Sequence, residues 1–232
     1  MGSMIAIETL QHDGSFNAYA ATFAGTPKAA IIVIQEIFGI NAGIRARCDR
    51  WAEAGYLAIA PDLFWRIQPG VELDPDVPAE FQQAIDNMMK FDTDKGVSDI
   101  EAAIRAARGK IGGGKVGIVG YCLGGKMSYL AATRTDVDAS VAYYGGGIDG
   151  LLGEAHATAN PLMLHFAGAD HFISAEALSK IHSGLDGNRH VAIHEYPGVD
   201  HGFATESGKR RVEQAAVLAD SRTSAFFAEH LG

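Results

Sequence analysis

The segment 116–128 of the chain, VGIVGYCLGGKMS, is an apolar run that turns through glycines into a helix-like continuation. Two chemistries fit it. Gly120 to Lys126 match a phosphate-binding loop, G-x-x-x-x-G-K-[ST], up to its final hydroxyl. Gly120 to Gly124 also match a nucleophile elbow, G-x-S-x-G, with the thiol of Cys122 in place of the hydroxyl. The rest of the chain has to decide between a nucleotide site and a nucleophile.

The residue that follows the lysine disfavours the phosphate loop. A working loop needs a Ser or Thr hydroxyl there to hold a magnesium ion, and this chain has Met127. Ser128 comes one residue too late, and a helix turns by about 100° per residue, so its hydroxyl points away from a phosphate at the loop. The nucleotide interpretation is therefore much the weaker one.

The nucleophile interpretation requires a base and a carboxylate that orients the base. In an α/β hydrolase these follow the nucleophile in the order acid, histidine, each on a loop after a strand. Asp170 follows the strand-like PLMLHF and His201 follows VAIHEYPG, so both are expected at the same sheet edge as Cys122. Asp200 adjoins His201 and is interpreted as a turn residue, and His165 lies within a strand and is interpreted as a packing residue.

The glycines and the neighbouring strand end predict an oxyanion hole. Gly120 and Gly124 leave space where strand and helix close on a strained turn, and the main-chain N–H of Leu123 faces the nucleophile at a helix N-terminus. In this fold the second amide comes from the loop after an earlier strand, which here gives Ile37. The spacing of the remaining histidines suits no metal site, so neither a metal nor a cofactor is predicted.

Apolar runs of strand length alternate with amphipathic segments of helix length, which is typical of an α/β fold with a mostly parallel sheet and helices on both faces. The clearest strands are expected at 30–35, 57–60, 116–119, 140–144, 161–166 and 190–196. Helices are expected at 42–54, 79–89, 97–107, 126–133, 175–183 and 209–230. Residues 1–24 suggest an antiparallel hairpin on the turn Asp13-Gly14. The proline-rich segment 62–94 is expected to cross the sheet edge, either as a lid or as a connection without a role.

Composition narrows the class of protein. The 232 residues suit a single domain over 4–232, and we interpret residues 1–3 as a cloning remnant. The formal charge of −9 is spread without a basic block, which argues against nucleic acid or a membrane surface as partner. The chain has no apolar run long enough to span a bilayer, so a cytoplasmic protein is expected, as a monomer or small homo-oligomer. Cys48 and Cys122 do not look like a disulfide framework.

Five stretches together resemble the dienelactone hydrolase (carboxymethylenebutenolidase) family. They are VIQEIFGIN (33–41), APDLFWR (60–66), GIVGYCLGGKMS (117–128), LHFAGADHFI (164–173) and YPGVDHGF (196–203). The resemblance implies that Cys122 is the nucleophile, His201 the base and Asp170 its carboxylate partner. It also gives Glu36 a role that spacing alone does not: the family's corresponding glutamate holds the resting thiol protonated and takes its proton when a substrate arrives.

The chain departs from the family at the residues that hold a substrate carboxylate. The best-described members use two arginines, one in the segment over the site and one a few residues after the histidine. Here residues 67–104 contain no arginine, and the segment 201–206 reads HGFATE. Lys90, Lys95, Arg210 or Arg211 are the candidates to replace them, although the sequence does not place any of the four at the site. An anionic dienelactone is therefore expected to be a poor substrate.

These observations predict a hydrolase that cleaves a small-molecule ester, lactone or thioester through an acyl-enzyme on Cys122. Five aromatic residues are candidates for an apolar acyl or alcohol subsite: Phe38, Phe64, Trp65, Phe81 and Phe203. The alternative from another class is a catalytically silent binding protein on the same fold. The presence of Cys122, Asp170, His201 and Glu36 together disfavours that alternative.

Overall fold

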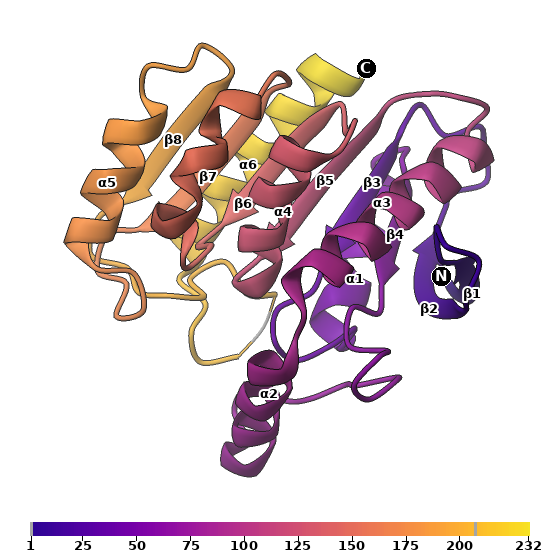
Figure 1. Ribbon diagram of the computed structural model, residues 1–232, viewed down its shortest axis with the longest axis horizontal. Helices are drawn as coiled ribbons and strands as arrows, with labels where there is room; N and C mark the ends of the chain where they lie inside the picture. Colours follow the sequence, from indigo (N-terminus) through magenta and orange to yellow (C-terminus); the bar gives the residue numbers. More distant parts are fainter. Residues whose placement is uncertain (1, 207) are drawn as a thin grey trace.

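Eight strands form one sheet in the computed structural model, which describes residues 2–206 and 208–232 (Figure 1). The strands are β1 (Ser3–Glu8), β2 (Ser15–Ala21), β3 (Ala30–Ile34), β4 (Leu57–Pro61), β5 (Val116–Tyr121), β6 (Ala139–Tyr143), β7 (Leu162–Ala167) and β8 (Val191–Tyr196). Their order across the sheet is β1-β2-β4-β3-β5-β6-β7-β8. The strands from β4 to β8 in this order are parallel, and β2 runs antiparallel to β4. The predicted fold class, α/β with a mostly parallel sheet, is confirmed.

The helices cover both faces of this sheet. They are α1 (Ala42–Glu53), α2 (Pro78–Lys90), α3 (Thr93–Lys110), α4 (Leu123–Arg134), α5 (Ala175–Leu185), α6 (Glu213–Leu231) and the 3₁₀ helix η1 (Ile148–Ala157). On one face α3 and α4 pack against the central strands, and η1 and α5 continue this layer. On the other face lie α1 and α6, which meet through an edge-on contact of Trp51 with Phe227. The strands β3, β4 and β5 are buried along their whole length, as strands covered on both faces are.

Several element boundaries differ from the expected ones for local reasons. Helix α3 begins at Thr93 rather than at residue 97, because the side chain of Asp92 accepts hydrogen bonds from the first free amides of the helix. Helix α4 begins at Leu123, immediately after the elbow, although its two glycines are poor helix formers. Helix α6 begins at Glu213 rather than at residue 209. The 3₁₀ helix between β6 and β7 was not predicted.

The N-terminal hairpin has the predicted antiparallel pairing. Strand β1 pairs with β2 from Ser3 opposite Ala20 to Glu8 opposite Ser15. Ser3 thus belongs to the hairpin, whereas Met1 lies outside the described residues, and the origin of residues 1–3 stays a prediction. None of the helices in the described ranges combines the length and apolarity that a membrane span requires.

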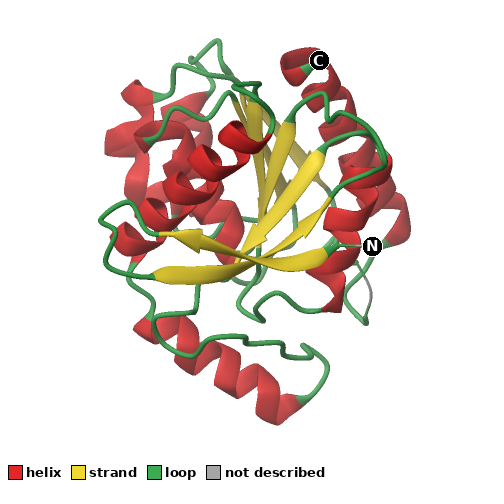
Figure 2. Ribbon diagram, turned by 90° about the vertical axis from the view of Figure 1, so that its right-hand side faces the viewer, coloured by secondary structure: helices red, strands yellow, loops and turns green. Residues whose placement is uncertain are grey.

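Helix α2 stands apart from the sheet and forms the most distinctive part of the segment 62–94. Figure 2 shows it as a separate helix beyond the edge of the domain. Before it, Gly39 makes an isolated bridge with Glu72, which ties the segment to the end of β3. Pro78 occupies the first turn of α2, where a missing N–H costs nothing. The segment thus crosses the carboxyl edge of the sheet as expected; movement as a lid stays a prediction.

Candidate active site

A cavity of about 410 Å³ lies at the carboxyl edge of the parallel strands. Its wall includes Glu36 after β3, Cys122 after β5 and His201 after β8. Its apolar lining comprises Ile37, Phe38, Phe81, Ile85, Met88, Phe91, Leu123 and Phe172. The cavity therefore joins three of the four predicted catalytic residues to a mainly apolar chamber, one wall of which is α2.

Cys122 occupies a strained turn between β5 and α4. Its φ of 56° and ψ of −113° place a non-glycine residue in a region that L-amino acids rarely adopt. The turn is held by a hydrogen bond from the Cys122 amide to the carbonyl oxygen of Tyr143 at 3.0 Å. Gly124 lets the turn press against β3, since an added Cβ there would lie 2.5 Å from the carbonyl oxygen of Ile34. These features are those of a nucleophile elbow.

His201 and Asp170 form a buried pair at the ends of β8 and β7. Nδ1 of His201 lies 2.8 Å from Oδ2 of Asp170. The other carboxylate oxygen of Asp170 accepts hydrogen bonds from the amides of Phe172 at 2.8 Å and Ile173 at 3.2 Å. The loop therefore holds the carboxylate in the orientation in which it bonds to the His201 ring. Asp200 has the turn role that the sequence indicates, since its carboxylate accepts the amide of His201 at 2.6 Å. The pair thus has the geometry of a base and its orienting acid.

The charge on the His201 ring is favoured by this arrangement. Burial opposes the charged ring, but the hydrogen bond to Asp170 and the proximity of Cys122 outweigh it and raise the pKa of His201 to about 10. The other ring nitrogen, Nε2 of His201, is buried and makes no hydrogen bond within residues 2–206 and 208–232. Nε2 is thus the nitrogen that remains available for the thiol of Cys122.

Glu36 shares the cavity with these groups. Burial raises the pKa of its carboxyl group, while the positive charges of His201, Arg47 and Arg210 act in the opposite direction. A carboxyl group with a raised pKa next to a nucleophile and a base is a candidate for proton transfer. The resemblance found in the sequence predicted Glu36 at this place, and the structure brings it to the wall that Cys122 and His201 also line.

The two predicted oxyanion residues also line the cavity. Leu123 is the first residue of α4, so its amide is one of those that a helix N-terminus leaves without an intrahelical partner. Ile37 follows β3 and lies on the same wall. The close approach of Gly124 to the end of β3 brings the two loops together. The structure therefore assembles the segments that the elbow pattern predicts, and the binding of an oxyanion by the two amides stays a prediction.

The structure separates the four basic residues that were candidates for a substrate carboxylate. Arg210 lines the cavity, where its guanidinium lies 5.2 Å from the ring centroid of Phe81. Lys90 and Lys95 line a different cavity, next to α3. Arg211 is bound to the carbonyl oxygen of Thr205 and to a glutamate outside the cavity. A further cation, Lys126 on the first turns of α4, also lines the active-site cavity and was not among the candidates.

The aromatic prediction was correct in part. Phe38 and Phe81 line the cavity and lie against each other at 5.8 Å. Phe64 and Phe203 are wholly buried in the core instead. Trp65 donates its indole N–H to Asp99 at 2.8 Å, away from the cavity. Ile85 and Met88 of α2 were missed, because helical spacing of apolar side chains is the same for a core face and for a cavity wall. Phe91 and Phe172 were also missed.

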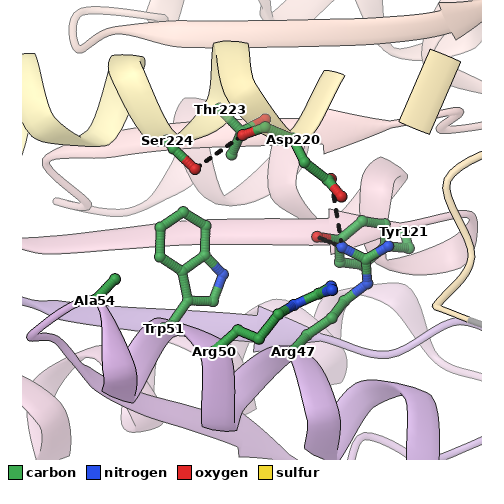
Figure 3. A pocket seen from close by; sticks show the side chains of 8 residues that line it. All are labelled: Arg47, Arg50, Trp51, Ala54, Tyr121, Asp220, Thr223 and Ser224. Atoms are coloured by element: carbon green, nitrogen blue, oxygen red, sulfur yellow. Dashed lines mark hydrogen bonds and ion pairs between the residues drawn. The ribbon is translucent and has the colours of Figure 1, made fainter. Parts of the chain in front are cut away.

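Sequence reasoning also missed Arg47, which is buried behind the site with 5% of its surface exposed. Its guanidinium donates to Tyr121 Oη at 2.8 Å and to the carbonyl oxygen of Ala204, and it lies 3.5 Å from Asp220. Figure 3 shows Arg47 and Tyr121 at a second cavity, of about 230 Å³, that residues of α1 and α6 line. The signal in the sequence was its position on the buried face of α1, three residues after Ile44.

The remaining predictions about single residues hold or are not tested. His165 is wholly buried and bonds to Tyr196 and Thr223, as a packing histidine does. Cys48 is buried in α1, and burial raises the pKa of its thiol. In the part of the chain that the structure describes, no cluster of three or more possible metal ligands occurs.

Comparisons with known proteins agree with this fold. The sequence matches the dienelactone hydrolase family over residues 16–231. It is 39% identical over 224 residues to a carboxymethylenebutenolidase of Pseudomonas putida, covering 96% of this chain and 95% of that protein. An Azospirillum brasilense protein provisionally named as the same enzyme is 45% identical, with 95% and 96% of the two chains covered.

A solved structure shows the same architecture. The crystal structure of a Klebsiella pneumoniae protein, provisionally described as a dienelactone hydrolase, superposes with a TM-score of 0.81 at 28% sequence identity. The match covers 98% of this chain and 99% of that one. The family match and the relatives extend over nearly all of the chain. The chain therefore belongs to the dienelactone hydrolase family of α/β hydrolases.

Proposed function

We propose that this hydrolase cleaves a carboxylic ester, lactone or thioester through an acyl-enzyme on Cys122. The carrying observation is that one cavity holds the strained Cys122, the ring of His201 and the carboxylate of Glu36, with Asp170 bonded behind His201. A strained nucleophile, a base with a free nitrogen and an orienting carboxylate are the parts that acyl transfer requires.

The proposed reaction has two halves. In acylation, the carboxylate of Glu36 takes the thiol proton, and the sulfur of Cys122 adds to the substrate carbonyl carbon while the His201 ring is still protonated. The tetrahedral oxyanion is bound by the amides of Leu123 and Ile37, and its collapse expels the alkoxide or thiolate, which takes the proton from His201. In deacylation, the neutral His201 deprotonates a water molecule that adds to the thioester. Collapse expels the thiolate, which takes the proton back from Glu36, and releases the carboxylic acid.

Glu36 is the proposed partner of the resting thiol. Its carboxyl group lines the same cavity as Cys122, and the opposing effects of burial and of nearby cations on its pKa suit a group that exchanges a proton. In Glu36→Gln both the rate of labelling of the free enzyme by iodoacetamide and the rate of acylation should change. Labelling and acylation that both match the parent enzyme would leave the glutamate with a structural role.

The lining of the cavity supports a substrate with an apolar acyl or alcohol part. Eight apolar side chains surround the site, three of them from α2. A neutral aryl ester is thus the first substrate to test. Hydrolysis of a chromogenic aryl ester would support the proposal; binding without turnover by the folded protein would favour the alternative, a silent binding protein on the same fold.

A second candidate substrate class, a lactone that carries a carboxylate, is favoured by Arg210 and Lys126. Both cations line the cavity, although the segment expected to hold the family's arginines lacks them. Losing a charge-assisted contact to a buried carboxylate costs about 2–5 kcal/mol, or roughly tens to thousands of fold in affinity. Turnover of a neutral ester and of a carboxylated lactone of similar size should be compared in Arg210→Gln, Lys126→Gln and, as a control outside the cavity, Arg211→Gln.

The expected result is that the unmodified enzyme prefers the neutral ester. A strong preference for the carboxylated lactone that disappears in Arg210→Gln would instead show that Arg210 has taken over the role of the missing arginines. Equal effects of Arg210→Gln and Arg211→Gln would contradict any special role of the cavity position.

A further inference from the structure

A small cavity of about 50 Å³ lies behind Glu36, separate from the cavity that holds the nucleophile. Glu36 lines both cavities, so its side chain stands in the wall between them. The polar residues that line the small cavity are Glu36, Asn41, Arg47, Tyr121, Tyr144, Thr205 and Glu206. None of the proposed catalytic steps uses this space.

Two hydroxyl groups at this cavity have no hydrogen-bond partner within the described residues. Tyr144 is wholly buried, and its Oη has no hydrogen-bond partner among these residues. The Oγ1 atom of Thr205 is also buried and also has no partner among them. A buried hydroxyl without a partner costs about 1–3 kcal/mol, so native proteins rarely leave two of them at one place. The two hydroxyls therefore point to a ligand that can donate and accept hydrogen bonds.

The backbone of Tyr144 is strained, which indicates that the fold requires this side chain at this position. Tyr144 has a φ of 38°, which is costly for a residue with a large side chain. Its amide donates to the carbonyl oxygen of His165 at 2.7 Å, and its ring packs 5.0 Å from the ring of His201. The strained turn thus carries the tyrosine from the end of β6 to a place between His201 and the small cavity.

The small cavity also has a cation in its wall. Arg47 lies there with its guanidinium 3.9 Å from the ring centroid of Tyr121. Its hydrogen bonds to Tyr121 and to the carbonyl oxygen of Ala204 hold it, and Figure 3 shows its contact with Asp220 on the far side. Because these contacts fix the guanidinium in place, Arg47 closes the cavity toward the surface between α1 and α6.

We propose that the cavity is an internal water site that hydrates the Glu36 carboxylate from behind and keeps it ionised while it is buried. A water molecule needs roughly 10–15 Å³ of such space and two to four polar partners. The volume of about 50 Å³ and the hydroxyls of Tyr144 and Thr205 meet both requirements. The water accepts from the hydroxyls and donates to Glu36, and Arg47 supplies the opposing charge.

The charges that face Glu36 come from several elements. The charged groups are Arg47 on α1, Lys126 on α4, and His201, Glu206 and Arg210 between β8 and α6; the other titratable groups are Tyr121 on β5, Cys122 at the elbow and Tyr144 after β6. Cations outnumber carboxylates in this set, and the positive charges of His201, Arg47 and Arg210 favour the ionised Glu36 against the effect of burial. Bound water also favours the ionised Glu36, because it donates a hydrogen bond to the charged carboxylate.

The first test locates the water. A crystal structure of the unmodified protein, at a resolution that places ordered water, should show a molecule within hydrogen-bond distance of both Tyr144 Oη and the Glu36 carboxylate. The second test follows the Glu36 carboxyl group itself by ¹³C NMR, with its signal assigned as the one lost in Glu36→Gln. This readout does not depend on turnover, so the water site and the proposed acyl transfer can fail independently.

In Tyr144→Phe and in Thr205→Val the Glu36 titration should move upward by about one pH unit, because each loss removes a partner of the water that stabilises the charged form. Tyr129→Phe and Thr158→Val are matched controls far from the cavity and should leave the titration unchanged; Thr158 also has a buried hydroxyl without a partner among the described residues. The proposal is overturned if no water bonds to Tyr144 in the crystal, or if Glu36 titrates at the same pH in both cavity variants.

Discussion

Removal of the Asp170 charge should change the ionisation of His201 and its ability to act as the base. Asp170→Asn keeps the size of the side chain and can still bond to Nδ1, but it no longer offers a negative charge at 2.8 Å. Asp200→Asn is the matched control, because that carboxylate also lies next to His201 in the chain and accepts its amide rather than its ring.

The size of the expected effect of Asp170→Asn follows from the raised pKa of His201. Its change from 6.5 to about 10 corresponds to about 5 kcal/mol in favour of the charged ring, at 1.36 kcal/mol per unit. The hydrogen bond to Asp170 and the proximity of Cys122 together supply this net free energy, against the opposing effect of burial. We expect Asp170→Asn to lower the pKa of His201 by at least about one unit and to reduce kcat by about 10²–10⁴-fold, as loss of the orienting carboxylate does in comparable triads.

The assay combines NMR titration of the His201 ring with hydrolysis of a chromogenic aryl ester. The His201 signals are assigned by comparison with His201→Gln. Asp170→Asn should show the lower pKa together with the loss of turnover, and Asp200→Asn should resemble the unmodified enzyme. A His201 pKa that stays the same in Asp170→Asn, or an equal loss of turnover in Asp200→Asn, would refute the reasoning.

Three further predictions concern the nucleophile, the elbow and the pH dependence of stability. Cys122→Ala should abolish ester hydrolysis, whereas Cys48→Ala, in the core of α1, should retain it. Gly124→Ala should lower the free energy of unfolding by about 1–3 kcal/mol in urea titration and also lower kcat, because its Cβ would lie 2.5 Å from the carbonyl oxygen of Ile34. The raised pKa of His201 stabilises the fold fully below pH 6.5, and this contribution is lost as pH rises through about 10. Urea midpoints measured across this range should therefore fall more in the unmodified protein than in His201→Gln.

Each of these predictions has a clear contrary result. Turnover that survives in Cys122→Ala, or equal losses in both cysteine variants, would contradict the nucleophile. A Gly124→Ala protein with normal stability and kcat would show that the elbow does not need the close approach to β3. Parallel stability curves for the unmodified protein and His201→Gln would show that the ring is not charged in the folded state.

The sequence was sufficient for the parts of the site that depend on local pattern and chain order. The elbow around Cys122 requires small residues at fixed positions, and Asp170 and His201 each follow an apolar run of strand length. Because parallel strands end at the same sheet edge, the order of these runs was enough to bring the three residues together. The structure adds the bond between His201 and Asp170 that this order implied.

The parts that the sequence could not provide depend on contacts between distant segments. Arg210 follows His201 by nine positions, and only the return of the loop past α2 brings it to the ring of Phe81 in the cavity. In the sequence nothing distinguishes Arg47 from other arginines on helices, because its partners Tyr121 and Asp220 come from distant segments. The orphan hydroxyl of Tyr144 likewise becomes visible only when the space around it is known.

Mass spectrometry of the intact protein tests the central claim, an acyl-enzyme on Cys122, most directly. The protein is mixed with an excess of an aryl ester, quenched with acid within the first turnovers, and digested to locate the added group. We predict a mass increase equal to one acyl group, located on Cys122 and absent from Cys122→Ala, and a larger acylated fraction when deacylation is slowed by a bulky acyl group. Hydrolysis of the ester with no acyl group on Cys122 at any time, or with the group on another residue such as Ser128, would contradict the account.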